Sequence, residues 1–174
     1  MSAPAPTAPL PDPVREAFVT AALTVLPELL QTEAVLLGDP ASLPGQATGP
    51  FCVATIGLQR QPPGRLSLRV PTAVAAQLAA RFLPSTTPLG DDLVDDALAE
   101  FANVIAGQAK TLLKGTPYHF TLTPPTVHRC AGAAMGYAES AGSALAVIDI
   151  ESQPLWLVVS WDTSESSARS ASAD

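Results

Sequence analysis

The sequence predicts an α/β protein of the two-layer α+β type, in which helices pack on an extended, largely antiparallel sheet. Three observations support this fold class. Apolar residues recur at helical spacing over residues 12–32, 72–83 and 91–114. Much of the remaining chain consists of short apolar or alternating runs, which are typical of strands. Turn residues such as those of the QPPG segment at 61–64 separate two of these runs and predict a hairpin.

The first expected helix runs from about residue 12 to about residue 32. Asp12 can cap this helix, with Pro13 at its first position. The apolar positions that recur at helical spacing are Phe18, Ala22, Val25, Leu26 and Leu29. Pro27 is expected to kink the helix or to divide it, because proline lacks an N–H group and its ring clashes with the preceding turn.

A hairpin and a second helix are expected next. Residues 39–50 are loop-forming, the apolar run 51–59 predicts a strand, and residues 65–70 form the returning strand. In the returning strand Leu66, Leu68 and Val70 alternate with Arg65, Ser67 and Arg69. This alternation predicts one buried face and one solvent-facing face. A helix over about 72–83 follows, with Val74, Leu78 and Phe82 one turn apart.

The second half begins with a long helix and ends in strands. The helix is expected from about Asp91 to about Lys114, where Gly115 ends it. Strands are then expected at residues 118–123, 126–136, 144–150 and 154–161. The last is apolar on both faces apart from Ser160, which predicts a central position in the sheet. Trp156 and Trp161 are five residues apart on it and should lie on opposite faces, as core or interface aromatics.

The expected organisation is one domain with two disordered ends. Residues 1–12 form a Pro/Ala-rich leader, and residues 163–174 form a polar tail that cannot bury enough apolar surface to become ordered. The chain has 174 residues, of which 47% are apolar. A single domain over residues 13–162 is therefore large enough to build its own core.

Charge and composition argue against several classes of function. The net charge is −7, and Lys110 and Lys114 are the only two lysines. Neither a nucleic-acid backbone nor an anionic membrane is therefore an expected partner. No segment resembles a signal peptide or a membrane-spanning run, so we expect a soluble cytoplasmic protein. Cys52 and Cys130 fit two buried or half-buried thiols in a reducing compartment better than a disulfide framework.

The long helix has two faces of different character. One apolar stripe, expected to face the core, consists of Val94, Ala97, Leu98, Phe101, Ile105 and Leu112. The opposite row, expected to face water or a partner, consists of Asp92, Asp96, Glu100, Asn103, Gly107 and Lys110. Aspartates 91, 92, 95 and 96 are expected to be solvated groups that oppose the helix dipole, rather than metal ligands or an acid pair.

Within this second row, the chain's only asparagine stands between a carboxylate and a glycine. Glu100 and Asn103 project together from one turn, and Gly107 lies one turn further on. A glycine costs a helix interior about 1 kcal/mol relative to alanine, but it lets another surface approach the helix closely. A carboxamide can hold a water molecule by donating and accepting hydrogen bonds. On spacing alone, a solvated helix face remains an open alternative.

The segment DLVDDALAEFANVIAGQAKTLL resembles the signature helix of the CheX-like chemotaxis phosphatases, within the CheC/CheX/FliY group. That helix carries Glu-x-x-Asn followed by Gly-x-Ala-Lys, matched here by Glu100, Asn103, Gly107, Ala109 and Lys110. The hairpin and helix before it, and the FTLTPPTV segment after it, are similar to the family in character. The likeness covers roughly residues 13–161 and implies the family's CheX/CheC-like fold.

The resemblance implies a phosphatase that acts on the phospho-aspartate of a CheY-like response-regulator receiver domain. Asn103 would orient a water for in-line attack on phosphorus, and Glu100 would pair with the receiver's active-site lysine. Gly107 would allow close docking, and Lys110 shares the docking face. No cofactor of the chain's own is implied, since Mg²⁺ and the aspartyl phosphate would come from the receiver. The logic matches that of GTPases, in which a glutamine positions the attacking water.

Departures from the family pattern imply that this protein has one active face rather than two. Some relatives carry a second Glu-x-x-Asn on the first helix, where this chain has only Glu28 and Gln31, expected to be ordinary surface residues. Gln108 stands where an asparagine is common. The resemblance also suggests a homodimer through sheet edges.

Two other functions remain open at this stage. One is a non-catalytic module that docks to a receiver or a motility component. The other is a small-molecule enzyme, which would need a concave site away from residues 100–107. His119 and His128 lack the partners of a catalytic triad or a metal site, so structural or surface roles are expected for them. The chain contains no Gly-x-Ser-x-Gly elbow and no phosphate-binding glycine loop.

Overall fold

The computed structural model describes residues 10–37, 49–84, 86, 88–131 and 143–161. The helices within these residues are α1 (Asp12–Leu30), α2 (Thr72–Phe82) and α3 (Asp91–Leu112). The strands are β1 (Ala34–Leu37), β2 (Phe51–Gln59), β3 (Gly64–Pro71), β4 (Thr121–Leu122), β5 (Thr126–Cys130), β6 (Ser143–Ile150) and β7 (Gln153–Trp161). Residues 1–9 of the expected leader, the tail and most of the loop expected at 39–50 lie outside the described residues. The end of the expected leader is ordered, because Leu10 is buried in the main core and Asp12 begins α1.

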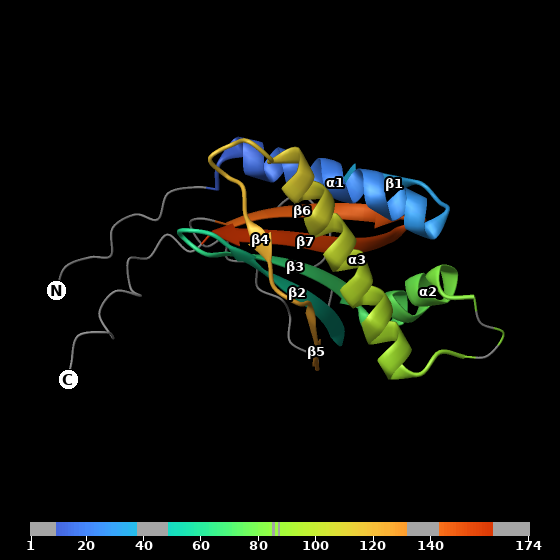
Figure 1. The fold of residues 1–174 in the computed structure, drawn as a ribbon. Coiled ribbons are helices and arrows are strands. Elements are labelled where there is room, and N and C mark those ends of the chain that lie inside the picture. Colours follow the sequence, from blue (N-terminus) through green and yellow to red (C-terminus); the bar gives the residue numbers. More distant parts are fainter. Residues whose placement is uncertain (1–9, 38–48, 85, 87, 132–142, 162–174) are drawn as a thin grey trace, which may run out of the picture.

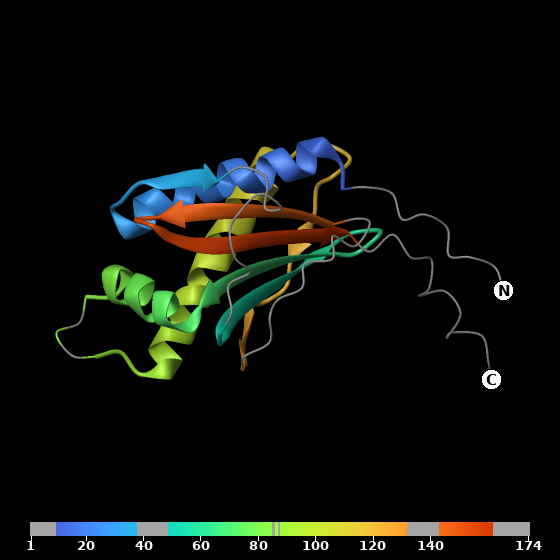
Figure 2. The same ribbon diagram turned by 180° about the vertical axis from the view of Figure 1, so that it is seen from behind.

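The described strands form one seven-stranded sheet in the order β1-β6-β7-β3-β2-β4, with β5 also paired to β2. Every pairing is antiparallel, and β7 lies between β6 and β3 as its apolar sequence predicts. α1, α2 and α3 cover the same face of this sheet, with α3 crossing it diagonally (Figure 1). Seen from behind, the strands lie in front of the helices (Figure 2). The predicted fold class is confirmed.

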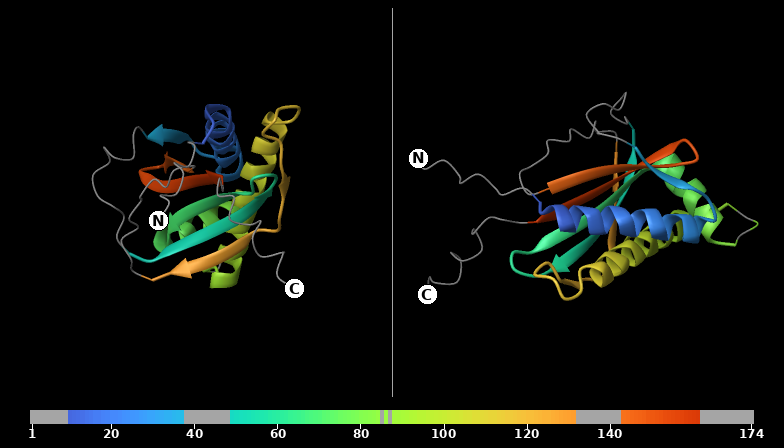
Figure 3. Two further views of the ribbon diagram at one scale, coloured as in Figure 1. Left: turned by 90° about the vertical axis from the view of Figure 1, so that its left-hand side faces the viewer. Right: turned by 90° about the horizontal axis from the view of Figure 1, so that it is seen from above.

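The main core lies between the sheet and the helices. It takes alternate residues of each long strand, such as Leu66 and Leu68 of β3, together with the buried sides of the helices. Viewed from above, α1 and α3 run side by side over the strands (Figure 3). A smaller cluster of Phe51, Val147 and Trp156 lies on the other face of the sheet. Trp161 belongs to the main core, so the predicted placement of the two tryptophans on opposite faces is confirmed.

Several element boundaries differ from the prediction. Helix α1 is not divided at Pro27, which lies in its last turn, and the helix continues to Leu30. Strand β1 was not expected, because its four residues carry too little pattern to be recognised alone. The strand expected at 118–123 is reduced to Thr121 and Leu122. The strand expected at 126–136 ends at Cys130, and residues 132–142 lie outside the described part.

Helix α3 begins at Asp91 as predicted and ends at Leu112, where Leu113 is the capping residue. Gly115 follows with a φ of +78°, a left-handed conformation that suits glycine after a helix. The predicted core stripe is confirmed except at its last position. Leu112 is 45% exposed, and Leu113 is buried in its place. The final turn of α3 therefore does not follow the burial pattern that the spacing predicted.

Candidate functional site

The candidate site is the outer row of α3. Glu100 and Asn103 are exposed, and Gly107 and Lys110 are partly exposed. Asp92 and Asp96 of the same row are exposed as well. In the part of the chain that the structure describes, no hydrogen bond or ion pair involves the side chain of Glu100, Asn103 or Lys110. The carboxylate and the carboxamide are therefore free to bind another molecule.

The opposite side of α3 holds these groups at a fixed position. Phe101, Ala102, Ile105 and Ala106 are fully buried between the exposed positions. The Phe101 ring makes an edge contact with Phe82 of α2, at a distance of 5.1 Å between ring centroids. The backbone that carries Glu100 and Asn103 is thus fixed by packing on both sides of each residue.

Gly107 leaves an open gap in the surface of α3. A Cβ built on Gly107 has no neighbouring atom within 4 Å, in contrast to Gly57, where a Cβ would meet the Thr123 side chain at 2.9 Å. The Gly107 carbonyl accepts a hydrogen bond from the Thr111 hydroxyl at 3.1 Å. Packing within the described structure therefore gives no reason for a glycine in the interior of this helix.

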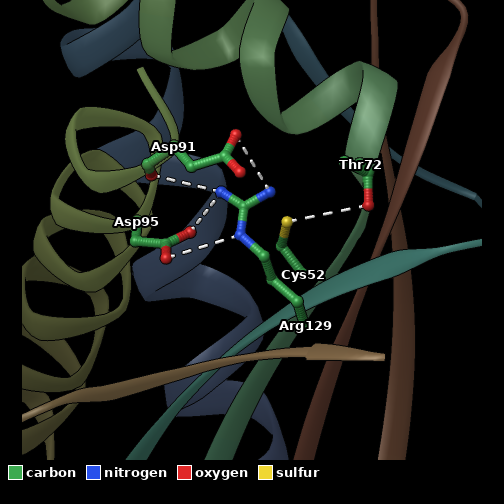
Figure 4. A network of polar contacts seen from close by, with 5 residues as sticks. All are labelled: Cys52, Thr72, Asp91, Asp95 and Arg129. Carbon is green, nitrogen blue, oxygen red and sulfur yellow. Dashed lines mark hydrogen bonds and ion pairs between the residues drawn. The ribbon is translucent and has the colours of Figure 1, made fainter. Parts of the chain in front are cut away.

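The first turns of α3 are tied to the sheet by Arg129 of β5 (Figure 4). Its guanidinium reaches both carboxylate oxygens of Asp95, at 2.6 Å from Nη2 and 3.5 Å from Nε. It also donates to the Asp91 carbonyl at 3.1 Å and lies 3.4 Å from the Asp91 carboxylate. The hydrogen bond to Asp95 raises the pKa of the Arg129 guanidinium above its ordinary value. Asp91 and Asp95 are therefore paired rather than only solvated, which corrects the sequence-based expectation.

The histidines and cysteines form no comparable cluster in the described structure. His119 and His128 are both exposed, as expected. Cys52 is buried, and its sulfur lies 3.8 Å from the Thr72 hydroxyl. Figure 4 shows these two side chains pointing toward one another. Cys130 is exposed, so the expectation of two buried or half-buried thiols is wrong for it. Among the described residues, no three His, Cys, Asp or Glu side chains are grouped so that they could hold a metal ion.

An open hollow of about 670 Å³ lies away from α3, between the end of α1 and the β6–β7 turn. Two of its three acidic groups, Glu151 and Asp149, have partners, and Glu33 has none in the described structure. Glu151 forms an ion pair with Arg81 at 2.9 Å and accepts a hydrogen bond from Thr32 at 2.8 Å. Asp149 accepts a hydrogen bond from the Ser152 backbone at 3.0 Å. These contacts join secondary-structure elements and do not favour the small-molecule enzyme.

No helix of the described residues is both long and apolar enough to cross a membrane.

A known protein family matches the part of the chain that contains α3. A family model described as "Chemotaxis phosphatase CheX" matches residues 52–151, which include all of α3. None of the curated sequences compared with this chain matches it.

Solved structures share the fold at low sequence identity. The chemotaxis protein CheX from Desulfovibrio desulfuricans has a TM-score of 0.70 at 19% identity, covering 86% of this chain and 99% of that one. CheX from Vibrio vulnificus has a TM-score of 0.69 at 17% identity, covering 86% and 96%. The CheX–CheY–BeF₃–Mg²⁺ complex from Borrelia burgdorferi gives 0.57 at 21% identity, covering 84% and 96%.

The family model spans more than half of the 174 residues, and it includes the helix with the exposed glutamate and asparagine and the partly exposed glycine. This match shows that the chain belongs to the CheX family of chemotaxis phosphatases.

Proposed function

We propose that this protein hydrolyses the aspartyl phosphate of a CheY-type receiver domain, using Asn103 to position the attacking water. The observation that carries the proposal is an exposed carboxamide without a side-chain partner in the described structure, held on a helix that is packed firmly on its other side. Membership of the CheX family supports the phosphatase activity. The complex of a Borrelia CheX with CheY supports the choice of partner.

Asn103 supplies alignment rather than acid–base chemistry. Its carbonyl oxygen accepts a hydrogen bond from the water, and its N–H group donates to the water or to a phosphoryl oxygen. The water attacks phosphorus in line, the bond between phosphorus and the aspartyl oxygen breaks, and inorganic phosphate and the free carboxylate leave. A carboxamide has no useful pKa, so the proton leaves with the phosphate or to solvent. Correct positioning of the reacting groups lowers the barrier to hydrolysis.

Glu100 supplies the docking contact. It projects from the turn before Asn103, so a cationic group that it binds lies beside the water position. The active-site lysine of the receiver is that cation in this proposal. The Mg²⁺ and the phosphoryl group also belong to the receiver, and the reaction takes place in the cytoplasm. Gly107 allows the two surfaces to approach, and Lys110 lies at the end of the same face.

The experiment follows the decay of a phosphorylated CheY-type receiver with and without this protein. The wild-type protein should accelerate release of inorganic phosphate. Asn103→Asp keeps the shape of the side chain but places negative charge beside the phosphoryl group and removes a donor, so it should be inactive. A decay rate with Asn103→Asp equal to that with the wild-type protein would reject the proposal.

A non-catalytic docking module is the alternative function. The same helix could bind a receiver through the exposed Glu100 carboxylate and the gap at Gly107 without hydrolysing its phosphate. Two results together would favour this alternative: receiver binding that survives Asn103→Ala, and no acceleration of decay by the wild-type protein.

A further inference from the structure

An exposed leucine lies on the same side of α3 as Glu100. Leu93 is 48% exposed and precedes Glu100 by seven residues, which is two helical turns. From Leu93, the exposed row continues at alternating spacings of three and four residues, through Asp96, Glu100, Asn103 and Gly107. This is the spacing of a seam along which one helix packs against another surface.

A single exposed leucine on a soluble protein needs no explanation in itself. Leu112, on the same helix, is 45% exposed, which is almost the same fraction. It lies nine residues after Asn103, however, and therefore on the opposite side of the helix. The position of Leu93 in the row of the proposed site distinguishes it from Leu112.

The turn that carries Leu93 is already ordered before any partner binds. Asp91 and Asp95, two residues to either side of Leu93, are both bound by Arg129 of β5. An apolar side chain on an anchored turn loses little backbone freedom on binding, so more of its burial energy contributes to affinity.

We infer that Leu93 is an apolar contact of the docking surface for the receiver, about 10 Å along α3 from Glu100 and about 15 Å from Asn103. The inference rests on the proposed function and extends it to partner choice. The receiver must present an apolar side chain about 15 Å from its phospho-aspartate. A receiver with a charged side chain there would have to desolvate the charge against Leu93 and would bind more weakly.

The test measures the affinity of the full chain for a CheY-type receiver that carries beryllofluoride and Mg²⁺ in place of the phosphoryl group. Leu93→Ser should weaken binding about five- to tenfold, as expected for losing the burial of about half a leucine side chain. Leu93→Met keeps the apolar contact and should bind within about twofold of the wild-type protein. Leu112→Ser is the matched control and should bind like the wild-type protein.

The kinetic readout separates docking from hydrolysis. Leu93→Ser should raise KM for the phosphorylated receiver by the same factor, while the rate at saturating protein stays within about twofold. Thermal unfolding of each variant checks that the fold is intact. Wild-type affinity in Leu93→Ser, or an equal loss in Leu112→Ser, would overturn the inference. Failure of the wild-type protein to hydrolyse any phosphorylated receiver would instead overturn the proposed function, and the affinity measurements would still decide the role of Leu93.

Discussion

At the scale of single residues, a substitution of Gly107 should change stability and activity in opposite directions. A Cβ at this position would meet no atom within 4 Å, so Gly107→Ala should raise the free energy of unfolding by about 1 kcal/mol. The same methyl group would hold a docked receiver away from Asn103 and should slow dephosphorylation roughly tenfold. Chemical denaturation and a phosphate-release assay measure the two effects.

Gly115 is the matched control for this substitution. Its φ of +78° is unfavourable for alanine, so Gly115→Ala should destabilise the protein by about 1 kcal/mol. Its activity per folded molecule should be unchanged, because Gly115 lies beyond the end of α3. Full activity in Gly107→Ala would show that the gap is not needed for docking.

Exposure was predicted correctly where the spacing of residues along one helix determines which side chains face the solvent. The spacing of α3 alone predicted that Glu100 and Asn103 face outward, and the structure has both exposed. The spacing predicted that Leu112 is buried, which is wrong, because periodicity does not show where the core ends along a helix. The role of Arg129 could not be predicted, since its contact with Asp95 joins residues 34 positions apart. The catalytic and docking roles of Glu100, Asn103, Gly107 and Lys110 stay predictions.

At the scale of elements, the link between β5 and the start of α3 can be measured by a double-mutant cycle. Arg129 and Asp95 form a two-pronged ion pair with side chains 31% and 30% exposed. Arg129→Ala, Asp95→Ala and the double variant should give a coupling energy of about 1 kcal/mol in unfolding experiments.

Asp92 supplies the control for this cycle, because it is exposed and its side chain has no partner in the described structure. The cycle of Arg129→Ala with Asp92→Ala should show coupling close to zero. A coupling energy near zero for Asp95 as well would contradict the anchoring of α3 by Arg129.

Elements with strong local patterns were predicted well, and elements that depend on distant partners were not. The start of α3 and the strand at 51–59 follow from their own sequences and are confirmed. Strand β1 exists because Ala34 to Leu37 pair with residues 147–150 of β6, more than 100 positions away. Four apolar residues give no sign of such a partner.

At the scale of the whole molecule, the sheet offers an edge for a second copy of the chain. Among the described strands, β1 is the last on its side of the sheet, and Val35 and Leu36 are 54% and 44% exposed. The predicted homodimer could pair β1 strands across a two-fold axis. Charged residues on an edge strand oppose such pairing, so Leu36→Lys should shift the protein towards monomer in sedimentation experiments.

Leu112→Lys provides the control for this prediction, since Leu112 has the same residue type and a similar exposure but lies on α3. It should leave the dimer unchanged. A wild-type protein that is monomeric at all accessible concentrations would contradict the dimer.

The fold class could be predicted from the sequence, but the order of the strands could not. Apolar alternation and turn residues indicate that an antiparallel sheet forms. They do not specify that β7 pairs with β3 and β6, because many strand orders bury the same apolar faces. The position of α3 across the sheet, which sets the direction of Asn103, depends on this order.

The most direct test of the account is the single-turnover rate of phospho-receiver hydrolysis at saturating protein. Saturation removes differences in docking, so the rate reports alignment of the water alone. If Asn103 positions the attacking water, Asn103→Ala should be slower than the wild-type protein by about 10²-fold or more. Equal rates for the two proteins would contradict the claim that Asn103 positions the attacking water.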